Sequence, residues 1–316
     1  MSQRYSLSAY VTTGLIALVL FALPRSAAAQ NLDTDLDSWM GFVPDAESLG
    51  KLTIPGSHDS GAMVEPIAGI AKCQSLTIRE QLDIGVRYLD IRLRQIDNAL
   101  VVHHGVVYQN LNFDDVLRQV TSFLQANPSE AVAMEVSSEH TPENNTESYE
   151  QTFLRYVNNP SYAAFWWRQD HVPTLGEVRG KIVLLRRFSG SAAGGINITG
   201  WQDNTQFTLT DARGGRIVVQ DNYKVSFGSN DTKWRQVTGL LDQAVADTGA
   251  TWYLNFTSGV WSFLGIPNIP GVSNDVNNRL VSFFRANPRH FVHHGTLISD
   301  FVSKQLVQQQ LRLYFE

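Results

Sequence analysis

Eight short runs of apolar and β-branched residues, separated by longer segments, constrain the fold of this chain more than any other feature. Several runs are apolar throughout, which is typical of strands buried on both faces of a parallel sheet. Strands that alternate with helical segments predict an α/β architecture. The eight runs cover residues 51–58, 86–93, 100–105, 131–138, 181–187, 216–221, 251–257 and 295–301.

The segments between the runs have helical periodicity. In residues 113–130 the apolar side chains recur at intervals of three and four, and both this segment and residues 275–288 contain a closing Asn-Pro. We therefore predict a TIM (β/α)8 barrel, with a doubly wound open sheet as the alternative. Because residues 94–99 are too few for a helix and residues 188–215 are rich in Gly, Ser, Thr and Asn, we expect a distorted, incomplete barrel in a single domain.

The N-terminal segment has the pattern of a secretory signal peptide. Arg4 precedes an apolar stretch from Gly14 to Leu23, and small residues follow before Gln30. The apolar stretch is shorter than a membrane span requires. We therefore predict a signal peptide over residues 1–29, a catalytic domain over residues 30–316, and a secreted, extracellular protein.

The charge of the chain excludes one class of partner. The net charge is −5, and the predicted signal peptide contains two arginines and no acidic residue. An acidic mature chain argues against a nucleic-acid binder that works by bulk positive charge. Cys73 is the only cysteine, so no disulfide can form within the chain. We expect a monomer.

Polar and ionisable residues follow nearly every predicted strand. In a barrel of this kind the functional side chains lie at the C-terminal ends of the strands, whereas a purely structural strand has no need of such groups there. The sequence therefore predicts an active site built from these ends, with candidates His58, Asp59, Arg92, His104, Ser137, Arg187, Asp221, Ser258 and Asp300.

His58 and His104 are the candidate acid and base, because imidazole titrates near neutral pH. His103 and His104 point to opposite faces of a strand, so only one of them can face the barrel mouth. Arg92 supplies a permanent cation that suits phosphate, and this set of groups fits phosphodiester cleavage by an internal hydroxyl. A metal site built from His and Asp residues is the competing interpretation, and Arg92 argues against it.

The series of motifs between residues 37 and 300 resembles the secreted bacterial phosphatidylinositol-specific phospholipases C. This resemblance implies a distorted TIM barrel that needs no metal and no other cofactor. It also implies cleavage of phosphatidylinositol, and often of glycosylphosphatidylinositol anchors, to diacylglycerol and inositol 1,2-cyclic phosphate. The motifs, in chain order, are IPGSHDSGA, YLDIRLR, VVHHG, LQANPSEAVAMEV, RGKIVLLRRFSGS, GWQDN, VVQDNYKVS and LNFTS.

The resemblance implies a role for each residue of the reacting centre. His58 matches the general base for the inositol 2-hydroxyl, and Asp300 matches its carboxylate partner. His104 matches the general acid for the leaving diacylglycerol, and Asp59 matches its partner. Arg92 matches the cation on the phosphate.

The resemblance also implies a set of polar residues that bind inositol. Hydroxyl-rich sugars suit such a set, because carboxylates accept from hydroxyls and an aromatic face stacks on the ring. Ser137 stands where the family has a lysine that contacts the sugar, so we expect lowered activity or a preference for a differently substituted inositol. The implied inositol-binding residues are Arg187, Trp201, Asp203, Asp221, Tyr223 and Ser258.

Two apolar segments are predicted to reach a membrane surface. Residues 257–272 contain Trp261, Phe263, Leu264 and Ile266 without a core periodicity, and exposed apolar loops with Trp insert into the membrane interface. A helix over residues 65–73 would make the second contact. The alternative is that residues 257–272 cover the barrel and contact no membrane.

Two other functions are weighed against a metal-independent phosphodiesterase. A catalytically weakened protein could bind membranes or glycolipids through the same pocket, and Ser137 favours it, but a binder has no need for both histidines. A metal-dependent glycerophosphodiester hydrolase would need carboxylates where Arg92 and Arg187 lie. We therefore favour the phosphodiesterase on inositol phospholipid, with a peripheral and transient membrane contact.

Overall fold

The computed structural model describes residues 35–286 and 292–315, which belong to one compact unit, Asn31–Glu316. A twelve-stranded sheet forms the centre of this unit, and β12 and β13 form a separate hairpin. The strands are β1 (Ile54–Ser57), β2 (Tyr88–Ile96), β3 (Ala99–His104), β4 (Val107–Asn112), β5 (Val132–Ser138), β6 (Trp166–Trp167), β7 (Ile182–Arg187), β8 (Ile196–Asn197), β9 (Gln206–Thr210), β10 (Arg216–Gln220), β11 (Trp252–Phe256), β12 (Trp261–Phe263), β13 (Ile266–Asn268) and β14 (Thr296–Ser299).

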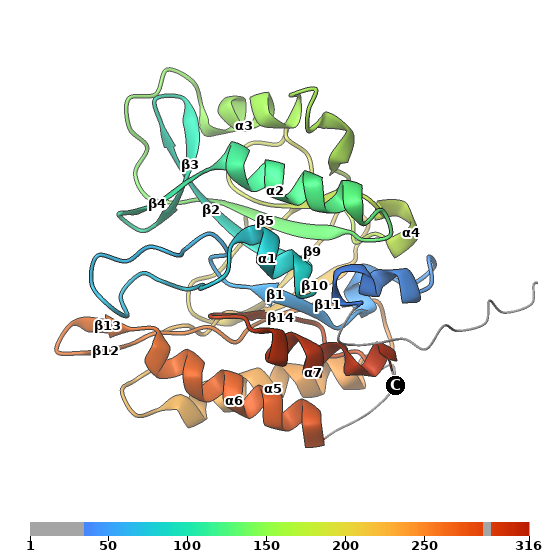
Figure 1. The fold of residues 1–316 in the computed structure, drawn as a ribbon, viewed down its shortest axis with the longest axis vertical. Helices are drawn as coiled ribbons and strands as arrows, with labels where there is room; N and C mark the ends of the chain where they lie inside the picture. The colour runs from blue at the N-terminus through green and yellow to red at the C-terminus, as the bar shows by residue number, and fades with distance from the viewer. Residues whose placement is uncertain (1–34, 287–291, 316) are drawn as a thin grey trace, which may run out of the picture. The chain divides into compact units, whose positions relative to one another are not determined.

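Helices cover the outside of the sheet (Figure 1), where α1 packs beside α2, and α6 packs beside both α5 and α7. The α-helices are α1 (Ile78–Asp83), α2 (Phe113–Ala126), α3 (Tyr149–Val157), α4 (Leu175–Val178), α5 (Asn230–Ala246), α6 (Pro270–Ala286) and α7 (Lys304–Phe315). Three 3-10 helices complete the described elements: η1 (Leu36–Phe42), η2 (Leu49–Lys51) and η3 (Ala163–Phe165).

The sheet is an incomplete barrel. Parallel strands follow one another in the order β6, β7, β5, β2, β1, β14, β11 and β10, and antiparallel β9 ends the row. In the described ranges no ladder joins β6 or β8 to β9, so the sheet curls without closing. The prediction of a distorted, incomplete TIM barrel is confirmed, and the alternative of a doubly wound sheet is not what the chain forms.

The third predicted strand is not a parallel strand of the barrel, as a regular barrel would require. Residues 100–105 form most of β3, which runs antiparallel to the C-terminal half of β2 and pairs in turn with β4. The physical reason is the short connection, because a parallel crossover needs about a dozen residues or more. The hairpin nevertheless returns the end of β3 to the level of Arg92, since Leu93 pairs with Val102.

Helix α2 illustrates how the sequence builds the outer layer. Its first turn is capped by Asp115, whose carboxylate accepts a hydrogen bond from the Asn112 backbone N–H at 3.0 Å. One face of the helix is apolar at intervals of three and four residues, and burial of this face against the sheet provides most of its stability. The buried side chains of this face are Phe113, Val116, Leu117, Val120, Phe123 and Leu124.

Close approach of the strands at the barrel centre requires a glycine. Gly56 lies in β1 between β2 and β14. A Cβ atom at this position would lie 3.1 Å from the side chains of both Ile298 and Tyr88. Even an alanine at this position would therefore require its neighbours to move by a few tenths of an ångström.

Two predictions about other segments have different outcomes. Residues 65–73 form bends and turns in place of the expected helix, because Pro66 and Gly69 interrupt the segment. The predicted signal peptide, residues 1–29, lies outside the described residues. Among the helices that the structure describes, none is long and apolar enough to span a membrane.

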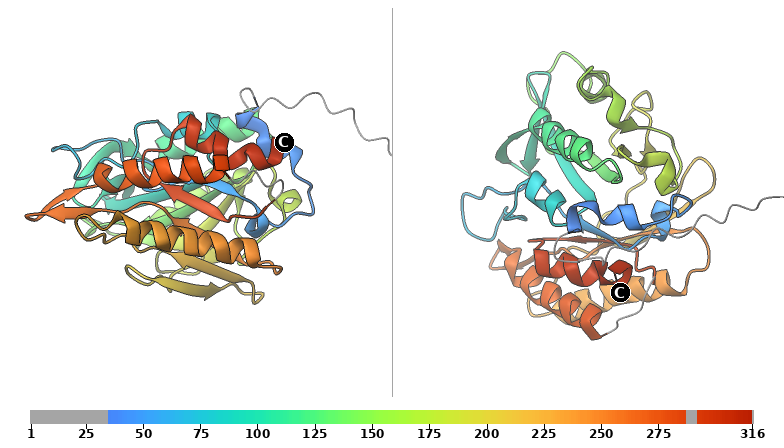
Figure 2. Two further views of the ribbon diagram at one scale, coloured as in Figure 1. Left: turned by 90° about the horizontal axis from the view of Figure 1, so that it is seen from below. Right: turned by 45° about the vertical axis from the view of Figure 1, so that its right-hand side comes forward.

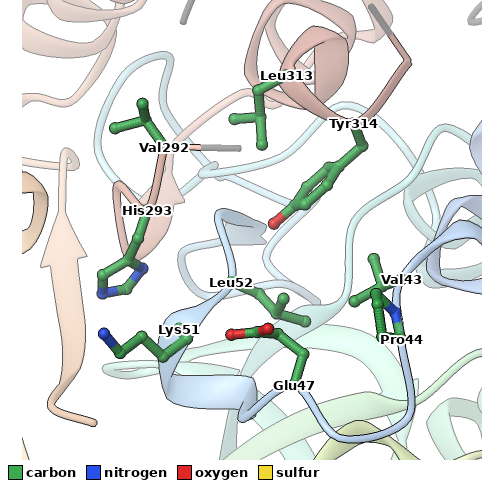
Figure 3. A pocket seen from close by; sticks show the side chains of 9 residues that line it. All are labelled: Val43, Pro44, Glu47, Lys51, Leu52, Val292, His293, Leu313 and Tyr314. Carbon is green, nitrogen blue, oxygen red and sulfur yellow. The ribbon is translucent and has the colours of Figure 1, made fainter. Parts of the chain in front are cut away.

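A small cavity of about 120 Å³ lies at the N-terminal ends of β1 and β14. Figure 3 shows its lining, in which Lys51, His293 and Tyr314 converge beside Glu47. Burial and the nearby Lys51 ammonium lower the pKa of His293 to about 4. Conserved chemistry in barrels concentrates at the opposite end of the strands, and the larger polar cavity lies there.

Candidate active site

A cavity of about 340 Å³ opens at the C-terminal ends of the parallel strands. It brings together side chains that are up to 242 residues apart in the chain, such as His58 and Asp300. Apolar residues, among them Ile70, Val260 and Ile269, also line it. The predicted site residues that line this cavity are His58, Arg92, His104, Arg187, Asp203, Asp221, Tyr223 and Asp300.

His58 and Asp300 meet because of the strand register. Strands β1 and β14 are parallel and pair Ser57 with Ser299, so the next residue of each strand lies beside the other. His58 Nδ1 is 2.7 Å from Asp300 Oδ1. Gln74 fixes both strand ends, since its side-chain amide donates to the carbonyl oxygens of His58 and Ser299.

The partners of His58 determine which of its nitrogens carries the proton. Arg92 Nη2 lies 2.8 Å from Nε2, and a guanidinium can only donate, so Nε2 holds the lone pair and Nδ1–H donates to Asp300. Burial lowers the pKa of His58 and so does Arg92, but the Asp300 and Asp90 carboxylates outweigh them, and the net pKa is raised above 6.5. The neutral ring presents its basic nitrogen next to a cation.

Arg92 is held by a buried carboxylate on its own strand. Asp90 and Arg92 lie two residues apart on β2 and therefore face the same side, and Arg92 Nη2 donates to Asp90 Oδ2 at 2.9 Å. Burial would raise the pKa of Asp90, but Arg92 and His58 outweigh burial and lower it to about 2. The pair leaves the guanidinium partly exposed to the cavity, where it can bind an anion.

His104 is held differently from His58. Its Nδ1 lies 2.7 Å from the carbonyl oxygen of Ala71, and because a carbonyl only accepts, Nδ1 carries a proton. Asp59 Oδ2 is 3.8 Å from the same nitrogen, which is an ion-pair distance rather than a hydrogen bond. The neighbouring His103 is buried against Tyr108, as expected for the histidine that points away from the site.

Asp59 lies beneath the site in a strained backbone conformation. Its φ of 38° is in the left-handed region, which Asp tolerates better than most residues. The side chain is 0% exposed, and neither carboxylate oxygen has a hydrogen-bond partner among the described residues. Burial raises the pKa of Asp59 to about 6, although His104 and Arg92 oppose this shift.

A second wall of the cavity is built around Arg187. Its Nη1 donates to the buried Glu135 at 3.0 Å, and its guanidinium lies 4.0 Å from the centre of the Trp201 ring. Trp201 Nε1 donates in turn to Asp221 Oδ2 at 3.1 Å. Arginine, indole and carboxylate are thus linked into one polar surface that offers both donors and acceptors.

An exposed cluster continues this wall toward solvent. Tyr223 donates its phenol proton to Asp203 at 2.8 Å, and Lys224 Nζ lies 2.7 Å from the other Asp203 oxygen. Hydrogen bonds from Lys224 and Tyr223 lower the pKa of Asp203. Lys224 therefore brings an ammonium group to this side of the cavity.

Some predicted residues lie behind the cavity rather than in its wall. Ser137, Trp201 and Ser258 are not among the lining residues of the described chain, and Ser137 and Ser258 are buried. Sequence reasoning missed Glu135, which supports Arg187, and the Ala71 carbonyl, which orients His104. An acidic residue inside the otherwise apolar run 131–136 was the available signal for Glu135, whereas a backbone carbonyl leaves no signal in the sequence.

Cys73 belongs to two groups of side chains that could hold a metal ion. One group is His58, Cys73 and Asp300, and the other is Asp59, Cys73 and His104; in each, the ligand atoms lie within 4.8 Å of one another. In the described conformation the Nδ1 atoms of both histidines carry protons that donate to Asp300 and to Ala71. A metal ion bound through either Nδ1 atom would have to displace the proton there.

Exposed apolar side chains gather beside the cavity. The β12–β13 hairpin projects from the unit on the same side as the loop that follows β1 (Figures 1 and 2), and the Ile269 N–H donates to the Gly69 carbonyl oxygen. Leu264 at the hairpin tip is 86% exposed. Phe227 is also exposed, and its ring lies 4.8 Å from Trp261 and 5.2 Å from Phe263.

A curled α/β barrel with a polar cavity at the C-terminal ends of its strands defines an enzyme of the TIM-barrel class. The family model "Phosphatidylinositol-specific phospholipase C, X domain" matches residues 51–188. A 1-phosphatidylinositol phosphodiesterase from Staphylococcus aureus is 31% identical over 302 residues, which cover 91% of this chain and 90% of that protein. A protein of the same name from Listeria monocytogenes is 26% identical over 285 residues, which cover 87% of this chain and 84% of that protein.

Solved structures agree with these relatives. A variant of the phosphatidylinositol-specific phospholipase C from S. aureus superposes with a TM-score of 0.80 at 28% identity, covering 89% of this chain and 98% of that chain. The enzyme from L. monocytogenes gives a TM-score of 0.69 at 26% identity, covering 88% and 98%. The chain belongs to the phosphatidylinositol-specific phospholipase C family and is an enzyme of that kind, which confirms the resemblance seen in the sequence.

Proposed function

We propose that this phospholipase cleaves phosphatidylinositol by attack of the inositol 2-hydroxyl on phosphorus, which yields diacylglycerol and inositol 1,2-cyclic phosphate. The observation that carries the proposal is the presence of His58, Arg92 and His104 on the wall of one cavity. A glycosylphosphatidylinositol anchor has the same reacting group, and it is a second candidate substrate.

Each proton has a defined path in this reaction. His58 Nε2 accepts the proton of the 2-hydroxyl while the O2–P bond forms, and Asp300 stabilises the resulting imidazolium through Nδ1–H. The bond between phosphorus and the diacylglycerol oxygen breaks as His104, protonated on both nitrogens, donates a proton to that oxygen. Asp59 Oδ2 lies 3.8 Å from His104 Nδ1, so its negative charge attracts the doubly protonated ring of the proposed acid.

Arg92 binds the phosphate oxygens, on which negative charge develops in the transition state. It occupies the place beside His58 where a metal ion would otherwise neutralise the phosphate, so we propose that the reaction needs no metal and no cofactor. The buried Asp90 holds the guanidinium in place, and its low pKa keeps this carboxylate ionised over the working pH range.

The polar wall is proposed to bind the inositol ring. Arg187 can donate to ring hydroxyls, Asp203 and Asp221 can accept from them, and Tyr223 can do either. Trp201 supports this wall through its contacts with Arg187 and Asp221.

Ser137 and Ser258 are proposed to act from behind this wall. Ser137 pairs with Arg187 in the register of β5 and β7, and Ser258 has a buried hydroxyl without a hydrogen-bond partner in the described chain. Lys224 supplies an ammonium near Asp203, which could take part of the role of the lysine that the family has at position 137. A weakened binder remains the alternative function, and turnover distinguishes the two.

The exposed apolar residues beside the cavity are proposed to contact the membrane. Phe263, Leu264 and Ile266 on the β12–β13 hairpin are exposed, and Trp261 lies at the base of the hairpin. Burial of such side chains in the interface would position the cavity over the lipid headgroups. Leu264→Asp is expected to reduce sedimentation with phosphatidylinositol-containing vesicles; unchanged sedimentation would contradict this contact.

The chain is further proposed to be an exported monomer that binds no nucleic acid. The N-terminal pattern in residues 1–29 supports export, and the net charge of −5 supports the lack of a nucleic-acid partner. Processing of residues 1–29 can be tested by mass spectrometry of the protein recovered from the medium of a secreting host.

Phosphorus NMR of the purified protein with phosphatidylinositol in detergent micelles and excess chelator tests the reaction. We expect the signal of inositol 1,2-cyclic phosphate, and its loss in both His58→Ala and His104→Ala. Activity that appears only when calcium is added would contradict the role of Arg92. Lack of turnover under both conditions, with intact binding to vesicles, would favour the weakened binder.

A further inference from the structure

Lys233 is a fully buried lysine that the proposed reaction does not use. It lies in the first turns of α5 and is 0% exposed. Its Nζ donates to three uncharged oxygens: the Phe256 carbonyl at 2.6 Å, the Asn222 carbonyl at 3.0 Å and Gln220 Oε1 at 3.3 Å. Burial of a lysine whose ammonium group is hydrogen-bonded only to uncharged oxygens is costly, so this one calls for a reason.

The three oxygens belong to two segments that follow neighbouring strands. Gln220 and Asn222 lie at the end of β10, and Phe256 is the last residue of β11. Gln220 joins the same network, since its amide donates to the Phe256 carbonyl at 2.9 Å and to Asn255 Oδ1 at 2.8 Å. The ammonium group therefore ties α5, the segment after β10 and the end of β11 together.

Both segments carry walls of the cavity. Asp221 and Tyr223 line the cavity. Along the chain they alternate with Gln220 and Asn222, the two residues of this segment that Lys233 contacts. The Phe256 ring lies edge-on to the His58 ring at 6.2 Å and to the Trp201 ring at 5.5 Å. A shift of either segment would therefore move groups proposed to bind inositol.

We propose that Lys233 is a positioning residue, whose ammonium group holds the segments after β10 and β11 so that Asp221 and Tyr223 keep the spacing that inositol requires. Because it takes the cavity as the inositol site, this inference rests on the function proposed above. An ammonium has three N–H donors for its three oxygen partners, whereas a neutral amine has two. Loss of the proton therefore releases one of the three contacts.

Burial lowers the pKa of Lys233 to about 8, although the Asp221 and Asp300 carboxylates oppose this shift. Among the described residues, the charged groups that face Lys233 are Asp221, which follows β10, and Asp300, which follows β14. Its contact from β11, the Phe256 carbonyl, is uncharged. The pKa values of Tyr223 and Lys224 are raised above their ordinary values of 10.0 and 10.5. Titration of Lys233 is therefore the expected cause of a change in inositol affinity just above pH 8.

Steady-state kinetics of Lys233→Met on a water-soluble inositol phosphodiester test the inference. We expect the KM at neutral pH to rise about 10-fold with kcat changed much less, because ground-state contacts to the ring are loosened. The wild-type KM should rise as the pH increases through about 8, and this rise should be missing in the variant. Lys181→Met removes a half-buried lysine that donates to the Ala164 carbonyl away from the cavity, and it should change neither property.

An unchanged KM in Lys233→Met, or a fall in kcat alone, would overturn the inference. If the variant does not fold, the dissociation constant of myo-inositol for the wild-type enzyme decides, because a constant value from neutral pH to above pH 9 would also overturn it. Cleavage of phosphatidylinositol without a cyclic phosphate product would contradict the proposed reaction and leave the role of Lys233 intact, so the two failures are distinguishable.

Discussion

The two histidine regions of the candidate active site are built from different parts. His58 follows a central strand and donates to the Asp300 carboxylate at 2.7 Å, whereas His104 is the last residue of a hairpin strand and donates to the Ala71 carbonyl at 2.7 Å. Both have an aspartate nearby, but only Asp300 forms a hydrogen bond with its histidine; Asp59 remains 3.8 Å away.

This difference suits opposite chemical tasks. A general base becomes positively charged in the transition state, and a carboxylate in direct contact stabilises that charge. A general acid must give its proton away, so a strong bond to a carboxylate would hold the proton back. We infer that the neutral Ala71 carbonyl orients His104 while Asp59 supplies a weaker attraction from a distance.

The largest expected effects come from removal of each histidine. Both His58→Ala and His104→Ala should lower kcat on phosphatidylinositol by roughly 10²- to 10⁴-fold. Replacement of diacylglycerol by a nitrophenol leaving group, which needs no proton, should restore much of the activity of His104→Ala and none of that of His58→Ala. Equal rescue of both variants would reverse or remove the distinction between acid and base.

The next effect separates the two aspartates. Asp300→Asn keeps a hydrogen-bond acceptor but loses the charge, and we expect kcat to fall about 100-fold. Asp59→Asn should lower kcat only about 10-fold, because its charge acts across 3.8 Å without a hydrogen bond. Circular dichroism of both variants checks that they fold, and an equal or larger loss in Asp59→Asn would contradict the comparison.

The pH dependence gives a smaller and more specific signal. As the proposed base, His58 can act only when neutral, and its pKa is raised above 6.5, so kcat/KM should fall as the pH drops through that raised value. Asp300→Asn removes the largest cause of the upward shift and should move this acidic limb to lower pH. A limb that stays in place in Asp300→Asn, measured on a soluble substrate, would mean that another group titrates there.

The smallest expected effect concerns stability. The pKa of Asp59 is raised from 3.8 to about 6 in the folded chain, so the folded state binds this proton more tightly than the unfolded state does, and stability is lost as the pH rises from about 4 to about 6. Asp59→Asn should therefore raise the Tm at pH 7 by a few degrees, corresponding to about 1 kcal/mol. Asp300→Asn should lower the Tm because it weakens the bond to His58.

Differential scanning calorimetry of both variants at about pH 7 and pH 4 tests this expectation. The gain in Asp59→Asn should shrink at the lower pH, where the wild-type carboxyl is protonated in the folded state and about half protonated in the unfolded state. A lower Tm for Asp59→Asn at pH 7 would show that its interactions with His104 and Arg92 outweigh the cost of its burial.

Much of the fold could be predicted from local patterns in the sequence. Seven of the eight apolar runs are parallel strands of the sheet, and the periodicity of residues 113–130 matches α2. The antiparallel β3 and the irregular segment 65–73 were not predicted, because pairing direction and turn formation depend on contacts outside the local pattern. His104 reaches the cavity because β3 folds back antiparallel onto β2, toward Arg92. A regular barrel has no such antiparallel hairpin.

The sequence by itself determined the chemical groups of this protein: strands buried on both faces, polar residues at their ends, and a histidine and arginine set close to these ends. Only the tertiary structure decided what each group contacts. The parallel register of β1 and β14 joins His58 to Asp300, a loop carbonyl orients His104, and Lys233 ties two strand ends from behind. Hydrogen bonds act over about 3 Å, and distances on that scale between residues far apart in the chain exist only once the chain is packed.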